Sequence, residues 1–180
     1  RTKFETWKLK FMKALEIIKM GSSLLKDKKI SSYILDSELL LSKTLKKSRE
    51  EILTDLNQII DTQKIIEFKR YLKRRSNNEP MAYILKEKEF WSKKFDVNKN
   101  TLIPRPETEI LVEQLIKNYK GKKISILDIG TGSGCIIISL LSNLIYSSGL
   151  GIDISKEAIT IAKKNAIKHK LLNRIKFLTR

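Results

Sequence analysis

The residues with the clearest chemical potential form a run of alternating glycines. The segment Asp128-Ile129-Gly130-Thr131-Gly132-Ser133-Gly134 has a glycine at every second position from Gly130 onward. Glycine lets the backbone turn tightly and lets a ligand approach the main chain without interference from a Cβ atom. The amides that open a following helix favour a carboxylate or a phosphate. We therefore expect this loop to bind a nucleoside cofactor through Gly130, Thr131, Gly132, Ser133 and Gly134.

An acidic residue downstream completes the candidate site. Asp153 follows Gly130 by 23 positions, and a carboxylate about 20 residues beyond such a loop can accept hydrogen bonds from both hydroxyls of a ribose. Either a dinucleotide or S-adenosylmethionine would suit this chemistry. The spacing here is G-x-G-x-G, whereas the dinucleotide fingerprint is G-x-G-x-x-G, and this difference favours S-adenosylmethionine.

The elements around the loop alternate between strand and helix. The pattern predicts strands at 124–129, 150–154 and from 175 onward, with helices at about 134–143 and 155–169. This β-α-β-α-β order predicts a doubly wound parallel sheet with right-handed crossovers. Because open sheets of this type usually have five or more strands, we expect about half of this domain to be missing from the chain.

The first part of the chain is predicted to be helical. Apolar residues recur at helical spacing in four segments, at 12–25, 31–45, from 48 and from 61, which indicates a small helical bundle. Basic residues on the fourth helix could bind the phosphates of a nucleic acid, although such a run is more typical of a solvated face. A hairpin is expected over 90–97, and a further helix from Pro106 to Tyr119 that ends at Gly121.

Composition narrows the function classes. The formal net charge is +17, with +10 in residues 1–100 and +7 in residues 101–180, so the excess is spread rather than gathered into one arm. A chain-wide compositional bias explains it best, and a weak contact with RNA or the ribosome is the alternative. Residues 1–11 lack the apolar core of a signal peptide, no apolar run could cross a bilayer, and Cys135 is the single cysteine. We expect a cytoplasmic monomer with no membrane contact and no metal site.

The residues that connect the two predicted parts resemble a known family. In order and spacing, the chain is similar to the release factor glutamine methyltransferases, the HemK/PrmC family. The similar segments are Asn78 to Leu85, Glu89-Phe90-Trp91, Leu102-Ile103-Pro104-Arg105-Pro106-Glu107-Thr108-Glu109, Leu35 to Leu41, the glycine loop, and Gly151 to Ser155 with Ala158, Ala162 and Asn165. The Pro-Arg-Pro-Glu-Thr segment is specific to this family, whereas many methyltransferases share the glycine loop.

The resemblance implies an α/β architecture in which an N-terminal helical bundle and a β-hairpin linker precede the first half of a Rossmann-like class I methyltransferase sheet. The expected parts are a leader at 1–11 that is not native, a docking domain for release factors at 12–77, a linker at 78–105 and an incomplete S-adenosylmethionine-binding domain at 106–180. Arg105, Glu107 and Thr108 would line the approach to the transferred methyl group. An ion pair between Arg105 and Glu107 that fixes the linker is the structural alternative.

The implied activity is methylation of the glutamine side-chain amide in the Gly-Gly-Gln motif of peptide-chain release factors. An amide nitrogen is a poor nucleophile because its lone pair is delocalised into the carbonyl, so hydrogen-bond acceptors must hold it in line with the methyl group. In this family, an Asn-Pro-Pro-Tyr motif after the fourth strand supplies those acceptors. The chain ends before such a motif, and we therefore expect no turnover from it alone. Lys86 also departs from the family, which usually has glycine there.

Two rival functions follow from the same residues. One is a methyltransferase of the same fold that acts on a base amino group in RNA or DNA, which the basic charge favours and the linker match opposes. The other is a non-catalytic module that binds the ribosome. For the chain itself, we expect easy aggregation or melting, because its third strand would leave an unpaired edge.

Overall fold

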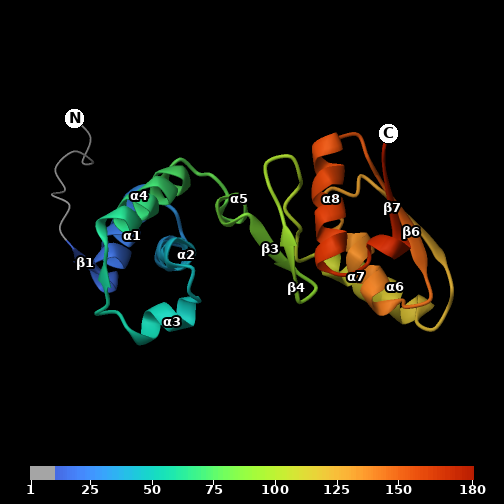
Figure 1. Cartoon of the computed structure of the whole chain (residues 1–180), viewed down its shortest axis with the longest axis horizontal. Helices are drawn as coiled ribbons and strands as arrows, with labels where there is room; N and C mark the ends of the chain where they lie inside the picture. The colour runs from blue at the N-terminus through green and yellow to red at the C-terminus, as the bar shows by residue number, and fades with distance from the viewer. Residues whose placement is uncertain (1–10) are drawn as a thin grey trace. The chain divides into compact units, whose positions relative to one another are not determined.

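A computed structural model describes residues 11–180 of the chain, so the predicted leader lies almost wholly outside the described residues. The chain divides into two compact units, Arg1–Leu85 and Lys86–Arg180 (Figure 1). The predicted linker at 78–105 is therefore split between them, because its hairpin packs with the second unit. The described part of the first unit is mainly helical, and the second unit carries a parallel sheet.

The first unit is a bundle of helices around one apolar core. Its elements are β1 (Met12–Lys13), α1 (Ala14–Asp27), α2 (Tyr33–Leu45), α3 (Arg49–Thr54), β2 (Ile59–Ile60), α4 (Thr62–Ser76) and α5 (Met81–Leu85). The four helical segments predicted from the sequence are confirmed as α1 to α4, of which α3 is short. The short strands β1 and β2 pair antiparallel, and α5 is a single helical turn. The sequence predicted none of these three elements.

Capping residues set where two of these helices begin. Ser48 opens α3 with a capping box, in which its Oγ accepts from Glu51 N–H and the Glu51 carboxylate accepts from Ser48 N–H. Asp61 opens α4 by accepting a hydrogen bond from Lys64 N–H at 2.9 Å. Each of these caps depends only on residues three positions apart, so the local sequence determines where the helix begins.

The second unit begins with a hairpin and continues as alternating helices and strands. It contains β3 (Glu87–Phe90), β4 (Lys93–Asp96), α6 (Thr108–Tyr119), β5 (Ser125–Ile129), α7 (Cys135–Asn143), β6 (Ser148–Asp153), α8 (Lys156–Lys168), a 3-10 turn at Leu172–Arg174 and β7 (Ile175–Thr179). The sheet is parallel throughout with strand order β5-β6-β7, which confirms the predicted topology.

The residue that directly precedes the hairpin has an unusual backbone geometry. Lys86 has φ +63°, in the left-handed region that favours glycine, and its carbonyl accepts a hydrogen bond from Val97 N–H. The sequence departure noted at Lys86 thus falls where a glycine would be unstrained. Phe90 and Phe95 of the hairpin are almost fully buried in the core of this unit, together with apolar residues of α7, α8 and β7.

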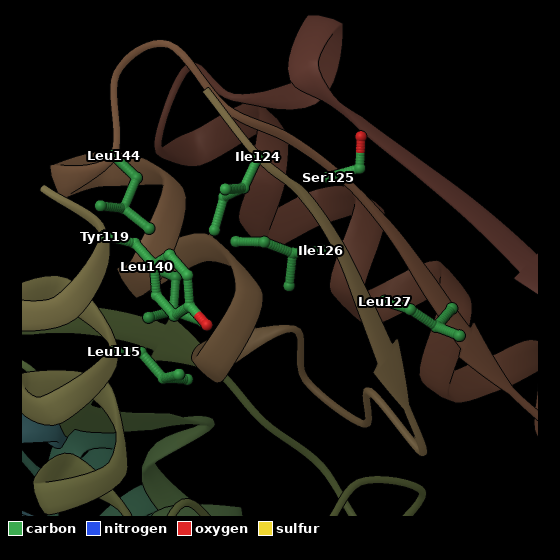
Figure 2. A pocket seen from close by; sticks show the side chains of 8 residues that line it. All are labelled: Leu115, Tyr119, Ile124, Ser125, Ile126, Leu127, Leu140 and Leu144. Atoms are coloured by element: carbon green, nitrogen blue, oxygen red, sulfur yellow. The ribbon is translucent and has the colours of Figure 1, made fainter. Parts of the chain in front are cut away.

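One edge of the sheet borders an open apolar groove. β5 is an edge strand, and Figure 2 shows its residue Ile126 and the preceding residue Ile124 beside Leu115 and Tyr119 of α6 and Leu140 of α7. The groove has a volume of about 430 Å³. Leu127 at this strand is 57% exposed. Strand β7 is also an edge, as expected, but the apolar groove lies along β5.

Candidate functional site

The glycine loop and the Pro-Arg-Pro-Glu-Thr segment meet at one small pocket. Arg105, which precedes α6, and Thr108, its first residue, face the loop between β5 and α7 across this pocket, whose volume is about 100 Å³. Its other lining residues are Leu102, Ile103, Pro104, Gly130, Thr131, Gly132, Ser133, Cys135 and Ile136. Ligand pockets usually measure 300 Å³ or more, so this pocket suits one part of a cofactor rather than all of it.

The backbone amides of the loop are mostly used within the protein. Gly130 N–H and Thr131 N–H both donate to the carbonyl of Ile152, each at 2.9 Å, and Gly134 N–H donates to the carbonyl of Thr131 at 2.8 Å. Gly132 N–H donates to Asp153 Oδ2 at 2.9 Å. These four N–H groups have partners within the protein in this structure, and binding of an anion by the amides of the loop stays a prediction. Within residues 11–180, the carbonyl oxygens of Gly130 and Gly132 accept no hydrogen bond, and they can accept one from a ligand cation.

The three glycines of the loop differ in what surrounds them. A Cβ atom on Gly130 would meet nothing within 4 Å, and one on Gly132 would touch only the Gly130 carbonyl oxygen at 3.9 Å. A Cβ atom on Gly134 would lie 3.0 Å from Ile138 Cδ1 and 3.3 Å from Ala162 Cβ. Gly130 and Gly132 thus leave open space for a ligand, whereas Gly134 allows α7 and α8 to pack closely.

Asp153 lies beside the loop at the carboxyl end of β6. Its Oδ2 accepts from Gly132 N–H, and its Oδ1 accepts from Ser155 N–H at 3.0 Å. These two bonds fix the carboxylate, and each oxygen keeps acceptor capacity for another donor. Because the side chain is only partly buried, two ribose hydroxyls can reach it. The structure brings Asp153 and the loop together as the sequence predicted.

A second carboxylate, Asp128, was not proposed as a site residue from the sequence. Burial raises its pKa, hydrogen bonds from the Thr131 hydroxyl and Ile137 N–H partly offset this effect, and the charge of Asp153 raises the pKa further. Thr131 Oγ1 donates to Asp128 Oδ2 at 2.8 Å. An acid that directly precedes a glycine loop was the available signal, because the carboxyl ends of adjacent parallel strands meet at one edge of a sheet.

The charge of this site favours a cationic ligand. Burial is the main cause of the raised pKa of Asp128, and the negative charge of Asp153 adds to it, so a nearby positive charge would favour the ionised form of both carboxylates. S-adenosylmethionine carries a sulfonium and an ammonium against one carboxylate, whereas the pyrophosphate of a dinucleotide is anionic. The unoccupied carbonyls of Gly130 and Gly132 also suit an ammonium donor. The residues present therefore fit S-adenosylmethionine better than a dinucleotide.

Of the three predicted substrate-binding residues, two lie at the pocket and one does not. Arg105 and Thr108 line it, whereas Glu107 is exposed and absent from its lining. The alternative ion pair between Arg105 and Glu107 does not form among residues 11–180. Instead, Glu109 Oε1 accepts from Trp91 N–H at 2.8 Å and ties the start of α6 to the hairpin turn. Sequence reasoning gave Glu109 no role.

The remaining candidate groups carry no chemistry of their own. Burial raises the pKa of the Cys135 thiol to about 11, which is typical of a buried packing group rather than of a reactive thiol. Within residues 11–180, no cluster of His, Cys, Asp and Glu could hold a metal ion. None of the helices in this part of the chain has the length and apolar character needed to span a bilayer.

The basic face of α4 is partly neutralised by ion pairs. Arg74 Nε lies 2.7 Å from Glu79 Oε2, and Arg75 Nε lies 2.7 Å from Asp36 Oδ2. The side chain of Asp36 is 5% exposed and that of Arg75 is 17% exposed, so this second pair is a buried structural contact. These two arginines therefore support the fold of the bundle, whereas the sequence favoured a solvated basic face for this run.

Comparisons with known proteins match both units. The model of the PrmC N-terminal domain matches residues 16–85, and a methyltransferase domain model matches residues 120–180. The release factor glutamine methyltransferase of Buchnera aphidicola subsp. Baizongia pistaciae is 44% identical over 165 residues, which cover 90% of this chain and 58% of that protein. The protein of the same name from Leptospira interrogans is 41% identical over 157 residues, or 86% of this chain and 54% of that protein.

A bifunctional methyltransferase of Rickettsia typhi is also similar, at 40% identity over 80% of this chain and 32% of that protein. The chain thus spans about half the length of the release factor glutamine methyltransferases that it matches. The geometry of the site favours S-adenosylmethionine as the cofactor. With sequence similarity over both units, the chain belongs to the release factor glutamine methyltransferase family.

Proposed function

We propose that the whole protein transfers the methyl group of S-adenosylmethionine to the side-chain amide of the glutamine in the Gly-Gly-Gln motif of peptide-chain release factors. The observation that carries this proposal is the shared pocket, where Arg105 and Thr108 face the glycine loop. A cofactor held by the loop would present its reactive end near the segment that is specific to the family. The names of the relatives supply the substrate class.

We infer a distinct role for each group at the site. Asp153 accepts hydrogen bonds from the ribose hydroxyls, and the carbonyls of Gly130 and Gly132 accept from the ammonium group of the cofactor. Thr131 and Ser133 lie at the cofactor's methionine end, and Gly134 sets the start of α7. Arg105 and Thr108 line the approach of the substrate at the pocket, and Glu107 lies along that approach outside the pocket. S-adenosylmethionine supplies the activated methyl group, and these residues contribute by orientation and electrostatics rather than as a strong base.

The helical unit is proposed to dock the release factor, with residues 12–77 as the docking domain. Its basic helix α4 has two arginines engaged in ion pairs, which leaves less charge for binding phosphates. The alternative of a methyltransferase that acts on nucleic acid gains no support from these pairs. A cytoplasmic location, where release factors act, is part of the same proposal, as is a monomeric state.

A competition assay tests this function. The whole protein, with any sequence that follows Arg180, is incubated with radiolabelled S-adenosylmethionine, a release factor and RNA in one reaction. We expect label in the release factor, and none in a control release factor whose motif glutamine is replaced by alanine. Label found only in RNA would support the nucleic-acid alternative and refute the proposal. Absence of label in both acceptors would favour a non-catalytic binding module.

A further inference from the structure

Asn165 is a polar residue at the centre of an otherwise apolar helix face. It lies on α8, where its neighbours Ala162 and Ala166 are fully buried, and Asn165 itself is 0% exposed. An amide at such a position is costly unless its hydrogen bonds are made. Its Oδ1 accepts from Asp96 N–H at 2.8 Å, and its Nδ2 donates to the carbonyls of Asp96 at 3.0 Å and Ser133 at 2.8 Å. Both amide hydrogens and the oxygen are therefore used.

The bond to Ser133 fixes a peptide group inside the glycine loop. The carbonyl of Ser133 and the N–H of Gly134 belong to one planar peptide unit and point in opposite directions. Asn165 holds the carbonyl, and the carbonyl of Thr131 accepts from the N–H at 2.8 Å. Gly134 has φ +78°, in a region where glycine can change conformation at little cost. The two bonds together select one orientation of this peptide, beside the pocket that Ser133 lines.

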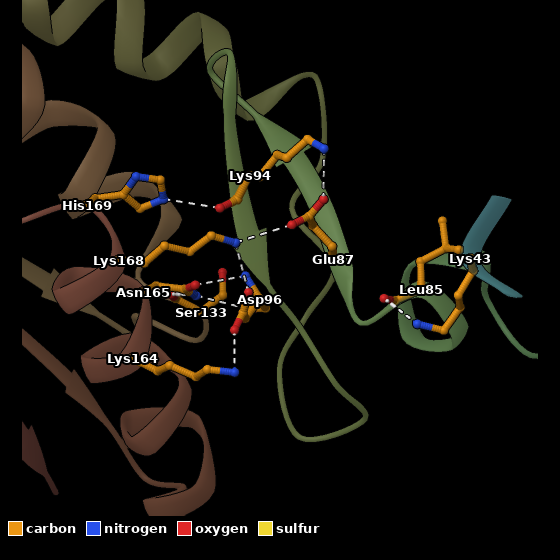
Figure 3. A network of polar contacts seen from close by, with 10 residues as sticks. All are labelled: Lys43, Leu85, Glu87, Lys94, Asp96, Ser133, Lys164, Asn165, Lys168 and His169. Atoms are coloured by element: carbon orange, nitrogen blue, oxygen red, sulfur yellow. Dashed lines mark hydrogen bonds and ion pairs between the residues drawn. The ribbon is translucent and has the colours of Figure 1, made fainter. Parts of the chain in front are cut away.

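The Asn165 side chain also holds the hairpin by hydrogen bonds. Asn165 bonds both backbone groups of Asp96 on β4, as a neighbouring strand would (Figure 3). The Asp96 carboxylate also pairs with Lys164 Nζ at 2.6 Å and Lys168 Nζ at 2.9 Å, both on α8. The side chain of Lys164 is 68% exposed, so its ion pair contributes little to holding the hairpin. The buried amide is the stronger link between β4, α8 and the loop.

We propose that Asn165 is a positioning residue that fixes the Ser133–Gly134 peptide against strand β4, so that the hairpin sets the shape of the cofactor loop. Asn165 lies in no pocket that the loop lines, and it acts through Ser133 rather than by touching the cofactor. The part of this inference that concerns cofactor binding rests on the proposed function. The orientation of the peptide can be measured without a ligand.

The test replaces Asn165 in the 180-residue chain and measures two properties. Asn165→Ala removes all three bonds, and Asn165→Asp keeps the volume but loses the donors when ionised. In folded samples, we expect the amide of Gly134 to exchange its hydrogen about tenfold faster or more, relative to the amide of Gly151 in the central strand. We expect affinity for S-adenosylhomocysteine, measured by calorimetry, to fall by about tenfold or more. Lys164→Ala, which removes an exposed contact to the same Asp96, should change neither property.

Two results separate this inference from the proposed function. If the unsubstituted chain does not bind S-adenosylhomocysteine, the assignment of the cofactor site fails, and the exchange rate of Gly134 alone decides the role of Asn165. Faster exchange in both variants then supports the positioning role. Folded Asn165→Ala and Asn165→Asp chains that keep the exchange rate of Gly134 would overturn it. An unchanged affinity despite faster exchange would overturn the claim that this orientation serves the cofactor.

Discussion

Gly134 combines two constraints that an alanine cannot satisfy together. Its φ is +78°, and a Cβ atom would lie 3.0 Å from Ile138 Cδ1 and 3.3 Å from Ala162 Cβ. A left-handed conformation costs an alanine about 1–2 kcal/mol, and crowding in a packed core adds about 1 kcal/mol or more. We predict that Gly134→Ala lowers the free energy of unfolding by about 2–3 kcal/mol, measured by denaturant titration.

Gly121 provides a matched control for this substitution. It has a similar φ of +79°, but a Cβ atom there would meet nothing within 4 Å. Gly121→Ala should therefore cost about 1 kcal/mol, from backbone strain alone. Equal losses for the two variants would show that close packing of α7 against α8 is not what requires glycine at position 134.

Residue spacing predicted where the loop is, but not how its groups are used. The alternation of glycines and the later Asp153 were enough to place both at one site. That the Ile152 carbonyl would take the amides of Gly130 and Thr131 depends on the exact end of β6, which no local pattern encodes. At Gly21, too, the local sequence does not show how the residue is packed. A glycine inside a helix usually weakens it, yet Gly21 lies where α1 packs directly against Ser37 and Phe68.

At the scale of elements, the contact between the hairpin and α8 should make stability depend on pH. Burial raises the pKa of Asp96, but hydrogen bonds from Lys164 and Lys168 outweigh it, so the net pKa lies below the ordinary value of 3.8. A lowered pKa in the folded state stabilises the fold above the unfolded value, and this contribution is lost as pH falls through the folded value. The contribution should therefore be complete at pH 7 and lost below about pH 4.

Asp96→Asn tests this dependence, because it removes the charge and leaves the backbone bonds to Asn165 in place. We predict that the variant is less stable than the unsubstituted chain at pH 7, and that the difference shrinks as the pH is lowered through 4 toward the folded pKa. Urea titrations across this pH range measure it. The exposed Glu113→Gln on α6 serves as the control. A difference that stays constant with pH would contradict the ion-pair explanation.

The elements themselves were largely predictable, and their long-range contacts were not. Ser48, Asp61 and Ser155 each accept a hydrogen bond from an N–H three residues later, so local sequence marks where α3, α4 and α8 begin. The bond between Asn165 and Asp96 joins residues 69 positions apart. Such a contact follows from how elements pack, and a single sequence gives no signal for it.

At the scale of the whole molecule, the open edge of β5 is the expected site of self-association. An unpaired edge strand offers free backbone groups, and here it adjoins an apolar groove lined by residues of α6 and α7. We predict that Leu127→Lys reduces concentration-dependent association of the chain, measured by light scattering, because charge on an edge strand opposes pairing.

The matched variant lies on the opposite edge. Leu178 on β7 is 44% exposed and does not line this groove, so Leu178→Lys should have the smaller effect. A larger effect from Leu178→Lys would assign the association to β7, the edge expected from the sequence.

The division of the chain at Leu85 also differs from the predicted linker, since burial of Phe90 and Phe95 places the hairpin with the sheet.

The central claim is that Asp153, fixed by the glycine loop, holds the ribose of the cofactor. Calorimetric titration of the chain with S-adenosylhomocysteine tests it most directly, with Asp153→Ala as the variant and the exposed Glu157→Gln on α8 as the control. Because hydrogen bonds to a charged group contribute about 1.5–3 kcal/mol, we predict a loss of affinity of about tenfold or more for Asp153→Ala and none for the control. Equal affinity of Asp153→Ala and the unsubstituted chain would contradict the account.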